Sequence, residues 1–214
     1  MDMKRDYYED VQNFSSGVVV FWFSLSMIAL ALFPFLFKNY YVYMANYMAI
    51  KIIVAVGVNL LVGYTGQISL GHAGFFAIGA YGTIILMTKA HFPFILALPV
   101  SALGTALFGF LLGLPALRLE GPYLSIATLG FGLTITQVIG RIEFFGGRQG
   151  LHAPDLIIGP WHLNTDREFY FLLIPLTVIL VLAARNLTKT KIGRAFIAIR
   201  DADIAAETMG VNLT

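Results

Sequence analysis

Long runs of apolar residues separated by short polar stretches make up most of the chain. Six of these runs hold 17 to 24 residues each and carry at most one charge. That is the length an α-helix needs to cross the hydrocarbon core of a bilayer. The expected spans are residues 17–37, 44–63, 70–87, 94–117, 123–139 and 169–187. The pattern predicts an all-α fold, a polytopic transmembrane helical bundle of about six spans.

The composition agrees with a membrane protein and narrows the chemistry. Hydrophobic residues make up 58% of the chain and charged residues 12%, whereas a soluble domain carries about 25% charged residues. The net charge of +2 is too small to indicate nucleic-acid binding. With no cysteine and four scattered histidines, neither disulfides nor a metal site is expected. We expect no cofactor.

The first apolar run resembles a signal peptide in part, because Lys4 and Arg5 precede it and Ala29-Leu30-Ala31 looks like a cleavage site. The run nevertheless continues to Phe37, and four acidic residues lie among the first ten. We therefore expect a retained anchor.

The distribution of Lys and Arg predicts the orientation of the spans. The densest basic stretch follows the sixth span. Placing it in the cytoplasm puts the N-terminus there too, with eight basic residues inside and five outside. The inside set is Lys4, Arg5, Arg118, Arg185, Lys189, Lys191, Arg194 and Arg200, and the outside set is Lys38, Lys89, Arg141, Arg148 and Arg167. The chain is thus expected to consist of a membrane domain, residues 1–187, and a cytoplasmic segment, residues 188–214.

The junction between the second and third expected spans, residues 64–76, is polar and rich in glycine. Seven glycines lie between positions 57 and 82. Such a segment predicts an interruption of the helix, because irregular backbone at membrane depth must be covered by protein or a water-filled cavity. Two interpretations remain open: tight helix packing through interhelical hydrogen bonds, or a polar site on a permeation path.

Four motifs of this sequence resemble those of the permease subunits of branched-chain amino acid ABC transporters, the LivM type. They are GYTGQISLGHAGFFAIGAYG (residues 63–82), LPALRLEGPYLSIATLGF (114–131), GGRQGL (146–151) and IGRAFIAIRDADIAAETMGVN (192–212). They occur in the family's order and cover most of the chain after Asn59. Family members continue with further apolar segments, so the resemblance implies that this sequence is shorter than usual.

The resemblance implies a translocation pore in the cell (inner) membrane without catalysis of its own. It implies a homologous second permease subunit, two cytoplasmic ABC ATPases and an extracytoplasmic substrate-binding protein as partners. Leucine, isoleucine and valine would be the cargo. The candidates for the substrate pathway are Asn59, Gln67, Ser69, His72 and Tyr81.

The last motif predicts a helix over residues 194–209, with Gly193 breaking the chain before it and Gly210 as its cap. Charged and apolar stripes on this helix suit docking into a partner, although an ordinary solvated surface helix has the same pattern. The resemblance favours contact with the ATPase. The coupling candidates are Gly193, Arg194, Ile197, Arg200, Asp203, Ile204 and Glu207.

Some polar positions within the spans have simpler interpretations. Lys51 is expected to extend toward the outer interface, with a pore-facing role as the alternative. Asn59 and Gln137 are typical of interhelical hydrogen bonds. No Walker A, HExxH or GxSxG motif is present, so ATP hydrolysis and common hydrolase chemistry are not encoded here. The rival functions are a related importer for urea or short amides and a stand-alone channel or structural subunit.

Overall fold

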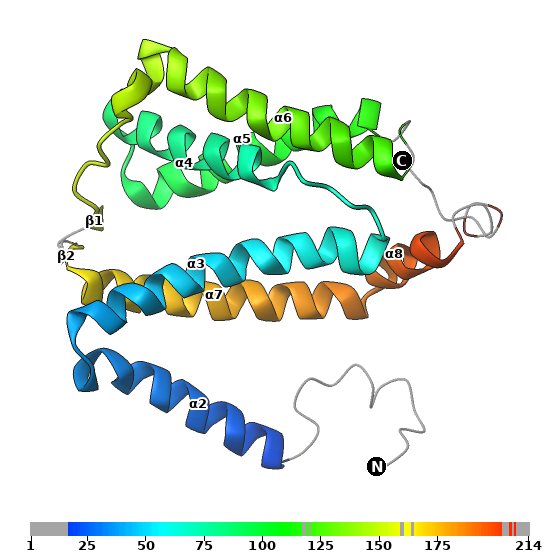
Figure 1. Cartoon of the computed structure of the whole chain (residues 1–214). Coiled ribbons are helices and arrows are strands. Elements are labelled where there is room, and N and C mark those ends of the chain that lie inside the picture. The colour runs from blue at the N-terminus through cyan, green and yellow to red at the C-terminus, as the bar shows by residue number, and fades with distance from the viewer. Residues whose placement is uncertain are drawn as a thin grey trace. The chain divides into compact units, whose positions relative to one another are not determined.

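Each of the six apolar runs forms a helix in the computed structural model, which describes residues 17–116, 119, 121–158, 161–163, 165–202, 206 and 208. The helices are α2 (Gly17–Leu36), α3 (Asn39–Asn59), α4 (His72–Thr88), α5 (Phe94–Ala116), α6 (Pro122–Arg141) and α7 (Asp166–Lys189), as Figure 1 shows. Five of them are long and apolar enough to cross a membrane, with α3 extended to Tyr64 by a π-helix. The sixth, α4, is shorter, with 17 residues. The predicted polytopic helical fold is confirmed.

Contacts along the chain divide it into two compact units. The first comprises residues 1–53 and 165–194, and the second residues 54–164 and 195–214. Helix α3 and the terminal helix α8 (Lys191–Asp201) each contribute residues to both units. The two units are built differently.

The first unit consists of α2, the first two thirds of α3, and α7. Its largest fully buried side chain is Tyr170 of α7, whose ring stacks on Phe33 at 5.9 Å between centroids. The Tyr170 hydroxyl donates to the carbonyl of Leu30 at 2.9 Å. Pro34 lies four residues after Leu30 in α2 and has no N–H to donate to that carbonyl. Tyr170 therefore supplies the hydrogen bond that the proline removes.

The ends of the helices in this unit are also held by polar groups. The Asn46 amide on α3 donates to the Asp166 carbonyl at the start of α7, at 2.9 Å. Thr165 caps α7 with a reciprocal capping box to Glu168, which satisfies two donors at the helix start. Lys51 of α3 is exposed and places its ammonium 5.1 Å from the centre of the Tyr47 ring, one turn back toward the start of α3.

The second unit contains the π-helix Leu60–Tyr64, the irregular residues 66–71, and helices α4, α5 and α6. Helices α4 and α5 approach closely where the Ser101 hydroxyl donates to the Gly79 carbonyl at 2.8 Å. Helices α4 and α6 meet at glycines: a Cβ added at Gly74 would lie 3.1 Å from the Gly132 Cα. Small residues thus let these helices approach closely, as is common in membranes.

The connection after α6 holds the remaining short elements. Two 3-10 turns, Glu143–Phe145 and Gly147–Gln149, precede a minimal antiparallel ribbon of β1 (Ile157–Ile158) and β2 (Trp161–His162). The register pairs Ile157 with His162 and Ile158 with Trp161. These two-residue strands are a local addition to a helical fold.

Candidate functional site: an interrupted span between two helices

The interruption predicted between the second and third spans is present. Helix α3 passes into the π-helix Leu60–Tyr64, and Gly66, with φ of +72°, ends the helical run. The Leu61 carbonyl accepts both from the Thr65 hydroxyl at 2.5 Å and from the backbone N–H of Gln67 at 3.3 Å. A π-helix of this kind is rare in proteins overall, and those that occur are frequently found at functional sites.

Hydroxyl groups of α6 satisfy the backbone of the interrupted segment. The Ser125 hydroxyl donates to the Ile68 carbonyl at 2.8 Å, and the Leu70 N–H donates to the Thr128 hydroxyl at 3.0 Å. Ser125 and Thr128 are three residues apart and therefore lie on one face of α6. Neither residue was among the candidates predicted from the sequence. The available signal was two hydroxyls at helical spacing near the start of the span.

The start of α4 is packed against α6 by glycine. A Cβ added at Gly71 would lie 2.9 Å from the Thr128 carbonyl oxygen, and one at Gly74 would lie 3.0 Å from the Phe131 ring. A backbone N–H or C=O group without a hydrogen-bond partner at membrane depth costs roughly several kcal/mol. The first and second sequence motifs therefore meet here for a physical reason: one supplies a broken backbone and the other supplies its hydrogen-bond partners.

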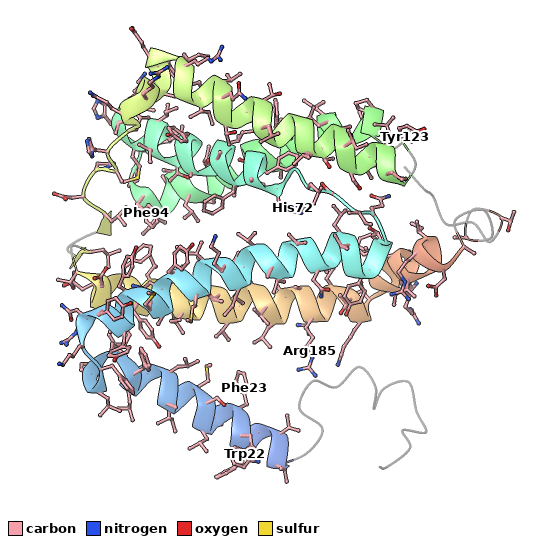
Figure 2. All side chains as sticks on the ribbon, viewed as in Figure 1. Trp22, Phe23, His72, Phe94, Tyr123 and Arg185 are labelled. Carbon is pink, nitrogen blue, oxygen red and sulfur yellow. The ribbon has the colours of Figure 1, made fainter. Side chains whose placement is uncertain are left out.

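The pathway candidates lie in two places within this unit. Gln67 and Ser69 belong to the irregular segment. His72, labelled in Figure 2, begins α4. All three side chains are half-buried. Asn59 is exposed, and its side-chain oxygen lies against Gly63, one turn further along the chain. Gln67, Ser69 and His72 thus all belong to the interruption or to the first residue after it.

Tyr81 lies elsewhere, further along α4. Its ring packs edge-on to Phe145 at 6.1 Å between centroids, and a Cβ added at Gly150 would lie 3.6 Å from its hydroxyl. Gly146, Gly147 and Gly150 all have positive φ, which explains why the GGRQGL motif contains glycine at these positions. Lys89, directly after α4, also contacts this connection, since its ammonium donates to the Phe144 carbonyl at 3.2 Å.

Two cavities among the described residues have different linings. A cavity of about 330 Å³ in the second unit is lined by Met87, His91–Phe94, Pro154 and Asp155. A groove of about 440 Å³ in the first unit is almost wholly apolar and lies between α2, α3 and α7. Phe23 of α2 points into that groove and Trp22 points away from it (Figure 2).

The terminal helix differs from its predicted form. We expected Gly193 to break the chain, with a helix over residues 194–209, but α8 begins at Lys191 and contains Gly193 as its buried residue. The prediction of a break was wrong, because Gly193 fits against the Thr188 carbonyl, where a Cβ would collide. The described part of α8 ends at Asp201. Asp203, Ile204, Glu207 and Gly210 lie outside the described residues.

Arg200 of α8 reaches the interrupted span. Its guanidinium donates to the Gly63 carbonyl at 3.0 Å and to the Asp201 carboxylate, also at 3.0 Å. Ile197 is half-buried and Arg194 is exposed on the same helix. The fourth sequence motif therefore contacts the first one, across 137 residues of sequence.

Comparison with known proteins agrees with these four motifs. Residues 40–214 match the family described as branched-chain amino acid transport system / permease component. The chain belongs to this family of permeases. It is a multi-pass membrane protein.

Two relatives are named high-affinity branched-chain amino acid transport system permease protein LivM. The protein from Salmonella typhimurium is 33% identical over 91% of this chain and 52% of its own length. The one from Escherichia coli is 34% identical over 90% of this chain and 51% of its own length. This permease-family chain thus spans about half the length of the curated relatives it matches. No solved structure is significantly similar to it.

Proposed function

We propose that this chain is a permease subunit of an ABC importer for leucine, isoleucine and valine. The family and the names of the two relatives support the transported class. The observation that carries the proposal is the interrupted span, because a broken helix with covered polar groups is how transporters build a substrate site inside a membrane. Partner subunits would supply ATP hydrolysis, and a binding protein outside the membrane would deliver the substrate.

The uptake of labelled leucine tests the cargo directly. The gene would be deleted in its own organism and then restored, and uptake would be competed with excess valine or excess urea. We expect uptake to follow the gene and to be blocked by valine. Competition by urea alone would reassign the cargo to urea or short amides. Energy-independent flux that persists after ATP depletion would favour a stand-alone channel.

The side chains gathered at the interruption, Gln67, Ser69 and His72, would line the substrate path. The Gln67→Ala variant is expected to lower leucine uptake by about tenfold, the effect of one lost buried hydrogen bond to a charged group. Gln137→Ala is the matched control, since Gln137 is an exposed glutamine on α6 away from the interruption. Equal effects of the two variants would remove Gln67 from the path.

Asn59 and Tyr81 would border the same path at positions before and after the interruption. Because Asn59 lies against Gly63 and Tyr81 against the 146–151 loop, their alanine variants would alter uptake less than Gln67→Ala. Lower uptake in Tyr81→Ala than in Gln67→Ala would place the principal substrate contact beside that loop instead.

The segment from residue 188 onward would dock the ATPase from the cytoplasmic side, using Gly193, Arg194, Ile197, Arg200, Asp203, Ile204 and Glu207. The Arg200→Glu, Ile204→Asp double variant is expected to lose co-purifying ATPase and transport. The control is Arg185→Glu, which reverses an exposed charge on α7. Unchanged co-purification and transport in the double variant would exclude this docking site.

The orientation can be tested because the chain has no cysteine of its own. A single cysteine at Arg148 would react with an impermeant maleimide added to whole cells. A cysteine at Lys191 would react only after the membrane is permeabilised. The opposite pattern would reverse the proposed topology, in which the N-terminus and the terminal segment are both cytoplasmic.

A further inference from the structure

The guanidinium of Arg200 lies where helix α3 has lost its own hydrogen bonds. The last carbonyls of a helix have no partner within the helix. Gly63 is among the last residues before the run ends at Gly66, and its carbonyl accepts from Arg200 at 3.0 Å. An arginine is suited to this position because it keeps its charge and offers five donors in a rigid fork.

A second bond fixes the direction of the Arg200 side chain. Its other guanidinium nitrogens approach the Asp201 carboxylate at 3.0 Å. The side chain is 44% exposed, so water competes with part of this ion pair. The bond to Gly63 uses the remaining terminal nitrogen, and Asp201 therefore orients the group that holds the span.

The backbones also come close at this point. A Cβ added at Gly66 would lie 2.8 Å from the Cγ, 3.6 Å from the Cβ and 3.7 Å from the Cα of Arg200. Gly66 has φ of +72°, a conformation that side chains rarely adopt. Glycine is thus needed here twice, once for the backbone conformation and once for the approach of α8.

We propose that Arg200 is a positioning residue that ties α8 to the end of the interrupted span, so that displacement of α8 moves residues 63–66 directly. This inference rests on the proposed function, in which α8 belongs to the segment that meets the ATPase. The inference adds a defined link to that function. The Arg200 side chain and its close contact with Gly66 join α8 to the segment that holds Gln67, Ser69 and His72.

Cysteines placed at positions 66 and 200 should form a disulfide if α8 lies against the interrupted span. In the Gly66→Cys, Arg200→Cys variant the two Cβ atoms would be 3.6 Å apart, within the 3.5–4.5 Å that a disulfide requires. The chain has no other cysteine, so the loss of maleimide-reactive thiols after mild oxidation measures this bond alone. The control pair is Gly57→Cys with Arg200→Cys, because Gly57 has no heavy atom within 4 Å of its added Cβ.

We expect the bond in the first pair and not in the control pair. In the complete transporter its rate of formation should change between the nucleotide-free and ATP-bound states, and reduction should restore the transport that the bond blocks. Absence of the disulfide in every nucleotide state, or an unchanged rate together with full transport in the oxidised form, would overturn the proposal.

Single substitutions test the same link in case cysteine at position 66 prevents folding. We expect Arg200→Ala to lower leucine transported per ATP hydrolysed by about tenfold, while the ATPase still co-purifies through the other docking residues, and Arg200→Lys to restore part of the transport. Lys191→Ala is the control, as an exposed cation at the start of the same helix.

Wild-type transport per ATP in Arg200→Ala would overturn the link and leave the proposed importer standing. If the unmodified protein carries no leucine, the proposed function fails, and the disulfide still decides whether the link moves with nucleotide.

Discussion

The α2–α3–α7 unit and the α4–α5–α6 unit use opposite means to hold apolar helices together. In the first, large side chains and a few polar bonds bridge the helices, as Tyr170 does on Phe33 and Leu30. In the second, the contacts between helices are made by residues without a side chain: Gly71, Gly74 and Gly132 let the backbones meet. Short hydroxyl side chains then form hydrogen bonds with the backbone groups that remain. The broken backbone lies in the second unit because close approach brings hydroxyls within reach of irregular backbone groups.

The largest effect should come from adding volume at the α4–α6 contact. In Gly74→Leu the new side chain would start 3.0 Å from Phe131 and 3.1 Å from the Gly132 backbone, which cannot move aside cheaply. Overpacking of this kind costs about 1–3 kcal/mol, occasionally more. We expect a marked drop in thermal stability in detergent and in folded yield.

Gly130→Leu on α6 is the control for that experiment, because a Cβ added at Gly130 would meet no heavy atom within 4 Å. If both variants were equally stable, the glycine contact would not hold the second unit together, and the contrast between the units would be lost.

A middle-sized effect should follow from removing one hydroxyl in the first unit. Tyr170 is 1% exposed, and Tyr170→Phe leaves the Leu30 carbonyl without its donor. An unsatisfied buried acceptor costs about 1–3 kcal/mol. The expected result is a lower midpoint of thermal unfolding with an unchanged helical signal.

The Pro34→Ala background sharpens this test. Alanine at position 34 restores an N–H that can bond the Leu30 carbonyl within α2, so Tyr170→Phe should cost less there. The difference is the coupling energy of a double-mutant cycle. Additive effects would mean that the tyrosine does not replace the bond lost at the proline.

The smallest effect is expected at the α4–α5 contact. Ser101→Ala removes the 2.8 Å bond to the Gly79 carbonyl but leaves the close approach intact. Interhelical hydrogen bonds in membranes average about 0.6 kcal/mol. Thermal unfolding should therefore shift only slightly. A loss as large as that of Gly74→Leu would show that hydroxyls, and not small size, dominate the second unit.

Sequence alone was sufficient for the helices and for the interruption. Apolar runs near 20 residues predict spans because of length and hydropathy, and each run coincides with a helix within a few residues. The concentration of glycine and polar residues after Gly63 predicted the break because such backbone cannot face lipid. These signals are local, so one sequence contains them.

The partners of the interrupted segment could not be predicted in the same way. Ser125 lies 57 residues from Ile68, and Arg200 lies 137 residues from Gly63, so no local pattern connects them. Gly193 was misinterpreted for a related reason. Glycine near a helix end usually marks a stop, but here a tight turn between α7 and α8 needs the absent side chain. Only the fold distinguishes these two uses.

The length of α4 has a consequence for the lipid around the protein. Its 17 residues rise about 25 Å, whereas the hydrocarbon core is about 30 Å thick. The bilayer beside α4 must thin by roughly that difference, or the polar residues before His72 must lie below the headgroups. Membrane thickness thereby becomes a variable that acts on the interrupted segment, and thicker bilayers should oppose any state in which that segment is exposed to lipid.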